Sequence, residues 1–485
     1  MTREHLALAL DPGDTRPLFA QIADGIARAI RGGRLAPGDR LPGSRSLADT
    51  LSVHRNTVLA AYAELLAQGW IVGENGRGTF VSEAVPEVSA RRFAPKSEGV
   101  PQRPGFALPP ARITAYARPE LPRGTLSIAD GVPDLRLVPV DELSRAYRRA
   151  VRGGDRRVMG YGFERGHPRL RAEIAALLNR ERGLTAKAED VLVTRGSQMA
   201  IYLTAQAVVA PGTVVVVESF SYRPAWEAFR AAGADIVAVR VDAHGLVVDE
   251  LAALVEKRRV SAVYVTPHHQ YPTLAVLSAD RRIALLELAR KHRFCIVEDD
   301  YDNEIHFQGR PVLPLASADR HGAVVYVGTL SKILAPSLRV GYAVAPRLVL
   351  DRMAQLRVFV DRQGDSPLEL AIAELLEDGV VQRHTRRMRR VCLARRDALV
   401  AALRSRLGDV LSFDAPVGGL ALWAAVAPGV DVDAWSERAL GKGVHFRSPR
   451  YYAFDGRSRS FLRASYAALR EEELEEAAKR MRAAL

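Results

Sequence analysis

The chain of 485 residues has only two cysteines, Cys295 and Cys392, which lie far apart and lack the spacing of a metal site. This scarcity argues against a disulfide framework and indicates a reducing compartment. The first residues hold no apolar signal core, and no apolar run approaches the roughly 20 residues that a membrane span needs. We therefore expect a cytoplasmic protein with no metal site, and the length predicts two or more domains.

Lysine is absent from residues 1–83, where nine arginines are balanced by nine acidic residues. The whole chain nevertheless carries a formal net charge of +13. Such a charge suggests a polyanionic partner, but the excess lies beyond residue 83. Nucleic-acid binding by the first segment must therefore be argued from its pattern, because its charge does not indicate it.

The first segment has the pattern of three helices followed by a hairpin. Apolar residues at spacings of four predict an amphipathic helix over residues 17–30. Ser44 predicts the N-cap of a second, short helix, and a third helix is predicted from about His54 to Gln68. Residues 70–72 and 79–81 predict two strands around a glycine-containing turn.

Two short helices and a hairpin are the plan of a winged helix-turn-helix, whose recognition helix enters the major groove of DNA. Arginine reaches phosphate or guanine, asparagine reads adenine, and threonine contacts phosphate or a thymine methyl group. The residues predicted to contact DNA are Arg45, His54, Arg55, Asn56, Thr57, Gly76 and Arg77. A small three-helix interaction domain with a solvated helix end has the same periodicity, so the pattern alone leaves both interpretations open.

Residues 41–58 closely resemble the DNA-binding domain of GntR-type bacterial regulators, and residues 69–79 continue the resemblance through the wing. This resemblance implies a winged helix-turn-helix over residues 1–83 that binds double-stranded DNA. Residues 84–125, with many prolines, predict an extended linker. The linker is either a plain spacer or a source of additional phosphate contacts through Arg91, Arg92 and Lys96.

Beyond the linker, short β-branched runs alternate with helical stretches. Continuous apolar strands separated by helices indicate an α/β fold with a mainly parallel sheet that is covered on both faces. The predicted strands occupy residues 191–194, 213–217, 262–265, 295–297 and 323–327. Ligands of such sheets bind at the carboxyl ends of the strands, so the polar residues after each run are the candidate site residues.

The residues at those strand ends match the needs of one cofactor, pyridoxal 5′-phosphate. Lys332 supplies the amine for a Schiff base, and Asp299 keeps the pyridine nitrogen protonated. Tyr301 places a hydroxyl near the ring oxygen, and Tyr222 covers the flat ring. The predicted phosphate ligands are Gly196, Ser197, Gln198, Ser331 and Arg339. Taken singly, each residue has an ordinary structural explanation, and only their order at successive strand ends indicates the cofactor.

From about Leu126 onward the chain resembles the fold-type-I aminotransferases, most specifically over residues 328–342, which contain Lys332. The resemblance implies that Tyr161 reaches the phosphate of a partner subunit, and hence a homodimer. It also implies that Arg463 binds the carboxylate of a substrate or effector, although a structural ion pair is the alternative for this residue.

A GntR-like domain fused to an aminotransferase-like domain over residues 126–485 resembles the MocR subfamily of bacterial regulators. That resemblance implies a transcription regulator in which pyridoxal phosphate, alone or with an amino compound, controls binding to promoters with paired half-sites through an internal aldimine at Lys332. The alternative is a pyridoxal-phosphate-dependent aminotransferase with an appended DNA-binding domain. Tyr271 and Leu274 replace the usual asparagine and glycine of aminotransferases, which weakens the case for efficient transamination.

Two arginine-rich segments, residues 145–157 and 383–396, stand outside these motifs. They are either a surface that faces DNA or solvated helix faces with ion pairs, and the second explanation is the more common one.

Overall fold

The computed structural model describes residues 8, 10, 11, 14, 16–74, 76–85, 103–108, 120–153, 156–309 and 312–485. The chain divides into two compact units, Met1–Pro109 and Pro110–Leu485. Most of the predicted linker, including Arg91, Arg92 and Lys96, lies outside the described residues. Within the described ranges, no helix is both long and apolar enough to cross a membrane.

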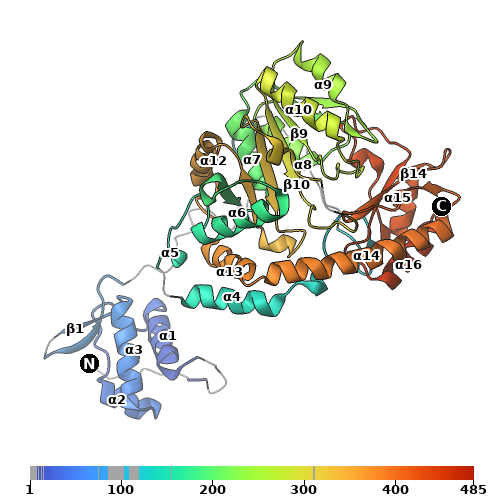
Figure 1. Cartoon of the computed structure of the whole chain (residues 1–485). Coiled ribbons are helices and arrows are strands. Elements are labelled where there is room, and N and C mark those ends of the chain that lie inside the picture. Colours follow the sequence, from blue (N-terminus) through green and yellow to red (C-terminus); the bar gives the residue numbers. More distant parts are fainter. Residues whose placement is uncertain are drawn as a thin grey trace. The chain divides into compact units, whose positions relative to one another are not determined.

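The described residues of the N-terminal unit form three helices and a β-hairpin (Figure 1, blue). These elements are α1 (Leu18–Arg31), α2 (Ser44–Leu51), α3 (Arg55–Ala67), β1 (Ile71–Glu74) and β2 (Gly78–Val81). Ile22, Ile26, Val58 and Leu65 are fully buried where α1 packs against α3. Helical spacing of these apolar side chains therefore builds the core of the unit, as the sequence pattern predicts.

The prediction that Ser44 caps the second helix is wrong. Gly43 holds the N-cap position without a side-chain cap, and Ser44 is the first helical residue. Its hydroxyl oxygen instead accepts a hydrogen bond of 3.3 Å from Nε of Arg55. The serine thus joins the start of α2 to the start of α3.

Among the described residues of the large unit, seven strands form the central sheet in the order β4-β12-β11-β10-β9-β5-β6. Their bounds are β4 (Val191–Thr194), β5 (Val214–Glu218), β6 (Asp235–Val239), β9 (Val260–Val265), β10 (Cys295–Asp300), β11 (Val324–Thr329) and β12 (Gly341–Val344). β12 runs antiparallel to both of its neighbours, and the other pairs of neighbours are parallel. The prediction of a mainly parallel sheet is confirmed.

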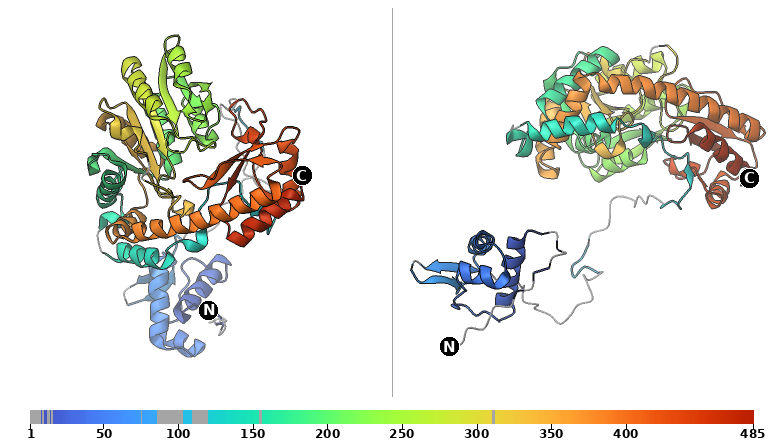
Figure 2. Two further views of the ribbon diagram at one scale, coloured as in Figure 1. Left: turned by 45° about the vertical axis from the view of Figure 1, so that its right-hand side comes forward. Right: turned by 90° about the horizontal axis from the view of Figure 1, so that it is seen from below.

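Helices cover both faces of this sheet (Figures 1 and 2). Along β5, Val215 and Val217 pack on one side with Phe229, while Val216 packs on the other side with Leu251. This alternation is the two-residue period of a strand that is buried on both faces. The α-helices of the large unit up to residue 377 are α4 (Val140–Arg152), α5 (Arg156–Met159), α6 (Pro168–Arg182), α7 (Ser197–Val208), α8 (Arg223–Ala231), α9 (Val248–Val255), α10 (Ala279–His292), α11 (Leu315–Ala318), α12 (Arg347–Val360) and α13 (Ser366–Glu377), among the described residues.

The C-terminal part of the large unit has a smaller antiparallel sheet of its own, in the order β13-β14-β16. The long helix α14 (Val380–Leu407) follows α13 and packs against α16 (Figure 2). In the small sheet, Trp423 of β14 lies opposite Arg463 of β16. The remaining elements are β3 (Leu126–Ser127), β7 (Val241–Asp242), β8 (Gly245–Leu246), β13 (Leu411–Ser412), β14 (Ala421–Val426), α15 (Val432–Gly441), β15 (Val444–His445), β16 (Phe461–Ser465) and α16 (Glu471–Arg482).

Candidate functional site

The central sheet brings the predicted site residues to one edge. β10 and β11 are parallel neighbours, with Asp299 opposite Val327, so the segments that follow both strands start side by side. Tyr301 directly follows β10, and Lys332 lies three residues after β11. Lys332 and Asp299 influence each other electrostatically. The sheet thus gathers an amine, a carboxylate and a phenol from two strand ends.

Asp299 is a buried carboxylate in which one oxygen accepts a hydrogen bond and the other has no partner among the described residues. The hydroxyl of Tyr264 donates a hydrogen bond of 2.6 Å to Oδ2. Oδ1 has no hydrogen-bond partner among the described residues. Burial raises the pKa of Asp299 to about 6, against the lowering effect of the bond from Tyr264. The open oxygen is therefore ready to accept a bond from a cationic N–H group, which would favour the ionised form.

Lys332 is half-buried, and its Nζ donates a hydrogen bond of 2.9 Å to the carbonyl oxygen of Gly131. Burial and the nearby positive charge of Arg463 lower the pKa of this lysine. A lowered pKa increases the fraction of neutral amine near neutral pH, and the neutral amine is the nucleophile in Schiff-base chemistry.

The turn between β4 and α7 forms a cradle for an anion. Gly196 has a φ of +76° and directly precedes α7, so the first backbone N–H groups of the helix are available. A Cβ atom at this position would lie 2.8 Å from Nη2 of Arg339, which donates to the carbonyl oxygen of Arg195. The positive φ favours glycine here, and the absence of a side chain lets the Arg339 guanidinium approach the loop. The loop at Ser197 and the guanidinium of Arg339 are therefore packed together.

Two further predicted phosphate ligands differ in their surroundings. Ser331 is buried, and its hydroxyl has no partner among the described residues. Gln198 uses its amide nitrogen to donate to the carbonyl oxygen of Pro224 at 2.9 Å. The amide nitrogen of Gln198 is thus already bonded within the protein. The hydroxyl of Ser331, by contrast, is left to bond to a ligand.

Three tyrosine rings, those of Tyr222, Tyr271 and Tyr301, lie together in the candidate site. Tyr271 makes edge-to-face contacts with Tyr222, at 5.8 Å between ring centroids, and with Tyr301, at 6.0 Å. The guanidinium of Arg463 lies 5.1 Å from the centroid of the Tyr271 ring. Tyr271, which replaces the usual asparagine, therefore contacts both Tyr222, the residue predicted to cover the cofactor ring, and Arg463, the predicted carboxylate ligand.

Arg463 is 1% exposed and has no carboxylate within ion-pair distance in the described part of the chain. Its Nη1 donates to the carbonyl oxygen of Ala129 at 3.3 Å, and its Nε has no partner there. A buried guanidinium without a counter-ion is costly, because its desolvation is not compensated. This observation argues against the structural ion pair and favours a role in holding an anionic ligand.

The open polar atoms of the site fit pyridoxal 5′-phosphate. The buried atoms without partners among the described residues include Oδ1 of Asp299, the hydroxyl of Tyr301 and Oγ of Ser331. They correspond to an acceptor for a ring N–H, a donor for a ring oxygen and a donor for a phosphate. Buried polar groups normally have partners, so three such atoms at the ends of β10 and β11, where Lys332 also lies, indicate a ligand site.

Three residues of this site were missed by sequence reasoning. Tyr264 carries a hydroxyl inside an otherwise apolar buried strand, and such a group needs a partner, which is a signal that the sequence does contain. Gly131 and Ala129 contribute backbone carbonyl oxygens to Lys332 and Arg463, and no side-chain pattern marks them.

The predicted DNA-contacting residues lie at the start of α3, on α2 and in the hairpin. His54 is the N-cap of α3, and its Nδ1 accepts a hydrogen bond of 3.2 Å from the backbone N–H of Asn56. Arg45, Arg55 and Asn56 are exposed, and Thr57 is half-buried. Gly76 and Arg77 occupy the turn between β1 and β2, where Arg77 pairs with Glu74 at 2.7 Å. The residue Asn75 lies outside the described part of the chain.

Tyr161 stands apart from the gathered site residues. It is 80% exposed, and the guanidinium of Arg362 lies 4.2 Å from the centroid of its ring. A tyrosine so exposed makes little contact with its own chain, which suits the predicted reach toward a second subunit.

Comparison with known proteins defines the class of each unit. Residues 18–81 match the family of bacterial regulatory proteins of the gntR type, and residues 131–481 match the family of class I and II aminotransferases. In solved structures, the chain is similar to LysN, an α-aminoadipate aminotransferase from Thermus thermophilus, with 29% identity and a TM-score of 0.70 over 75% of this chain and 92% of that one. The protein is a GntR-type winged helix-turn-helix joined to a fold-type-I aminotransferase domain with pyridoxal phosphate as its cofactor.

Relatives with both units identify the family more closely. The probable rhizopine catabolism regulatory protein MocR of Rhizobium meliloti is 32% identical over 90% of this chain and 88% of its own length. The regulator TauR of Rhodobacter capsulatus is 31% identical over 95% of both chains. The pyridoxine biosynthesis regulator PdxR of Corynebacterium glutamicum is 31% identical over 84% of this chain and 82% of its own length. The chain belongs to the MocR-type transcription regulators.

Proposed function

We propose that pyridoxal phosphate, bound at Lys332, sets the affinity of the winged domain for DNA, either alone or together with an amino compound. The observation that carries this proposal is the set of buried polar atoms without partners on Asp299, Tyr301 and Ser331, which lie at the ends of β10 and β11 as Lys332 does. In this proposal residues 1–83 bind DNA, residues 84–125 are the linker, and residues 126–485 bind the cofactor and effector.

The residues of the site have distinct roles in this proposal. Lys332 holds the cofactor covalently through its amine, whose lowered pKa supports that role. Asp299 accepts a bond from the ring nitrogen and Tyr301 donates one at the ring oxygen, while Tyr222 covers the ring. The phosphate is held by the backbone at Gly196 and by Ser197, Gln198, Ser331 and Arg339. The bound cofactor supplies an electrophilic carbon that captures amines.

Arg463 holds the carboxylate of the effector, an amino-acid-like compound. Its burial without a counter-ion supports this role. An effector changes DNA binding only to the extent that it binds one arrangement of the protein better than another. The hydrogen bond from Arg463 to the carbonyl oxygen of Ala129 offers such a difference, because a bound carboxylate competes for the same guanidinium.

The regulator acts as a homodimer in this proposal, with Tyr161 of one subunit at the cofactor phosphate of the other. Exposed apolar side chains support a covered face: Met159 is 68% exposed and Phe359 is 90% exposed. A two-fold dimer presents two recognition helices, so the DNA target contains paired half-sites.

The test is binding of the purified chain to the DNA upstream of its own gene, with and without pyridoxal phosphate. The absorption spectrum of the same samples reports covalent attachment of the cofactor. We expect a protein-bound absorption band and a changed DNA affinity or footprint for the wild type. Lys332→Ala loses both the band and the response, whereas Lys291→Ala, at an exposed lysine on α10, retains both.

An unchanged footprint with a clear absorption band would make an amino compound the controlling ligand, to be screened next. Absence of specific DNA binding together with rapid transamination between an amino donor and an oxo acid would overturn the proposal. The chain would then be an aminotransferase with an appended DNA-binding domain.

A further inference from the structure

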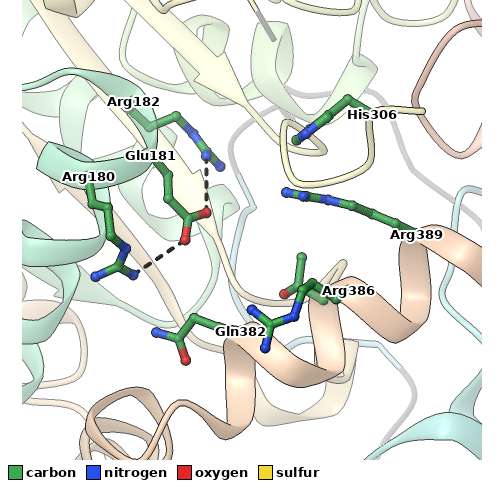
Figure 3. A pocket seen from close by; sticks show the side chains of 8 residues that line it. Arg180, Glu181, Arg182, His306, Gln382, Arg386 and Arg389 are labelled. Atoms are coloured by element: carbon green, nitrogen blue, oxygen red, sulfur yellow. Dashed lines mark hydrogen bonds and ion pairs between the residues drawn. The ribbon is translucent and has the colours of Figure 1, made fainter. Parts of the chain in front are cut away.

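A basic hollow lies between the end of α6, one face of α14 and the segment that follows β10 (Figure 3). Its volume is about 340 Å³, within the range typical of small-molecule sites. The lining residues are Arg180, Glu181, Arg182, His306, Gln382, Thr385, Arg386 and Arg389. None of them belongs to the cofactor site described above.

The hollow has an excess of positive charge. Glu181 lies between Arg180, at 3.3 Å, and Arg182, at 3.9 Å. By contrast, Arg386 and Arg389 have no carboxylate within ion-pair distance in the described part of the chain. Burial and the positive charges of Arg182 and Arg386 disfavour the charged form of Arg389, and the carboxylates of Glu181 and Glu304 only partly offset this. An anion in the hollow would supply the missing negative charge.

Two of the arginines, Arg182 and Arg389, are held in place by the surrounding chain. Arg182 is buried and pairs with Asp300 at 3.3 Å and with Glu304 at 2.5 Å. Arg389 donates from its Nε to the carbonyl oxygen of Glu304, which leaves its two terminal nitrogens for other partners. In Figure 3 the Arg182 and Arg389 side chains extend toward one another from α6 and α14. Donors held this way lose little conformational freedom when a ligand binds.

A second hollow of about 560 Å³ continues the first along α14 and shares His306, Arg386 and Arg389 with it. It adds Arg390, which has no carboxylate partner among the described residues. Gln382, Arg386, Arg389 and Leu393 follow the i, i+4, i+7 and i+11 spacing of a single helix face. The arginine-rich segment 383–396 thus directs part of its charge into a concavity, in addition to its solvated faces.

We propose that this hollow binds a small phosphorylated anion. Guanidinium groups recognise phosphate oxygens through paired, charge-assisted hydrogen bonds, and two unpaired guanidiniums beside a histidine suit a phosphate or pyrophosphate group. A concavity formed by α6, α14 and a loop suits a compact ligand better than an extended nucleic-acid backbone, which runs over open surfaces. The site is independent of the role proposed for Lys332.

The test uses the full-length protein saturated with pyridoxal phosphate, so that the cofactor's own phosphate cradle is filled. Sodium pyrophosphate is titrated by calorimetry at constant ionic strength. We expect one site per chain, and a loss of affinity of about tenfold for Arg386→Gln and for Arg389→Gln, the size of one lost charge-assisted bond. Arg387→Gln is the matched control, because Arg387 is an exposed neighbour on α14 that lines neither hollow.

The proposal would be overturned if all three variants lost the same affinity for pyrophosphate. It would also be overturned if Arg386→Gln and Arg389→Gln bound pyrophosphate as tightly as the wild type does. Arg386 has no hydrogen-bond or ion-pair partner in the described part of the chain, so its variant tests the site even if Arg389→Gln disturbs the contact with Glu304. The proposal would also be overturned if pyrophosphate did not bind and the affinity for DNA fell in Arg386→Gln but not in Arg387→Gln. The hollow would then be a contact for the DNA backbone.

Discussion

Three of the buried carboxyl groups in the central sheet, those of Glu218, Glu298 and Asp299, differ in what their oxygens contact. Burial raises the pKa of Glu218 to about 8, of Glu298 to about 7 and of Asp299 to about 6. Glu298 accepts bonds from two backbone N–H groups, at 2.7 Å and 2.9 Å, and Glu218 accepts from the N–H and hydroxyl of Thr266. Asp299 keeps an oxygen without a partner among the described residues. The first two are thus held by the fold, and the third is available to a ligand.

We predict that the affinity for pyridoxal phosphate falls as the pH drops below about 6, because the cofactor's ring cation needs the ionised form of Asp299. Asp299→Asn lowers the affinity at pH 8 by about tenfold, the size of one charge-assisted bond, and flattens this pH dependence. Spectroscopic titration across pH 5–8 measures both effects. Glu298→Gln is the control, and a similar loss in that variant would mean that the effect is structural.

The raised pKa of Asp299 also predicts how the stability of the cofactor-free protein depends on pH. A carboxyl group whose pKa is raised by folding binds more protons in the folded state, so the free energy of unfolding falls as the pH rises from the ordinary value of 3.8 through about 6. Asp299→Asn removes this contribution. Urea unfolding of the cofactor-free wild type and variant at pH 4.5 and 7 measures it. A difference between the two proteins that does not change with pH would contradict the assignment.

At the scale of elements, α3 begins with a histidine cap followed by exposed side chains. His54 caps the helix through Nδ1, which satisfies the backbone N–H of Asn56. The side chains of Arg55 and Asn56 are therefore exposed at the helix N-terminus, where the helix dipole also favours phosphate.

We expect Asn56→Ala to lower affinity for the operator by about 1–3 kcal/mol and to relax the preference at one base pair. Arg55→Ala weakens binding to specific and random DNA alike and reduces the salt dependence of the affinity. Fluorescence anisotropy with operator and scrambled duplexes at several salt concentrations separates the two behaviours. Arg34→Ala, at an exposed arginine after α1, is the matched control. Equal losses for Arg34 and Arg55 would indicate a general charge effect.

Most helices and strands of both units could be predicted from the sequence. A helix that buries one face repeats its apolar residues with a period of 3.6, and a strand that is buried on both faces is a continuous apolar run. The residues at the strand ends, such as Asp299 and Lys332, could also be predicted, since parallel strands end at one edge. The carbonyl contacts of Gly131 and Ala129 could not, because they depend on how residues far apart in sequence come to lie together. The bond between Arg55 and Ser44 could not be predicted for the same reason.

At the scale of the whole molecule, the large unit exposes apolar side chains that a single chain leaves uncovered. Phe359 near the end of α12 is the most exposed of them, and Met159 ends α5. Exposed apolar side chains that gather in patches mark interaction sites in soluble proteins. A second copy of the chain is the occupant we propose, because the proposed homodimer would also bring Tyr161 to a cofactor phosphate.

We predict that Phe359→Asp dissociates the proposed dimer, because a carboxylate in a covered apolar face loses hydration without gaining a partner. The monomer lacks the Tyr161 contact from its partner, so its affinity for pyridoxal phosphate falls as well. Its preference for paired over single half-sites disappears, since only one recognition helix remains. Sedimentation velocity measures the first effect, cofactor titration the second, and anisotropy with one-site and two-site duplexes the third. Ile283→Asp, at an apolar side chain of α10 that is 61% exposed, is the control. A Phe359→Asp protein that stays dimeric and keeps its affinity for the cofactor would place the subunit interface on another face of the molecule.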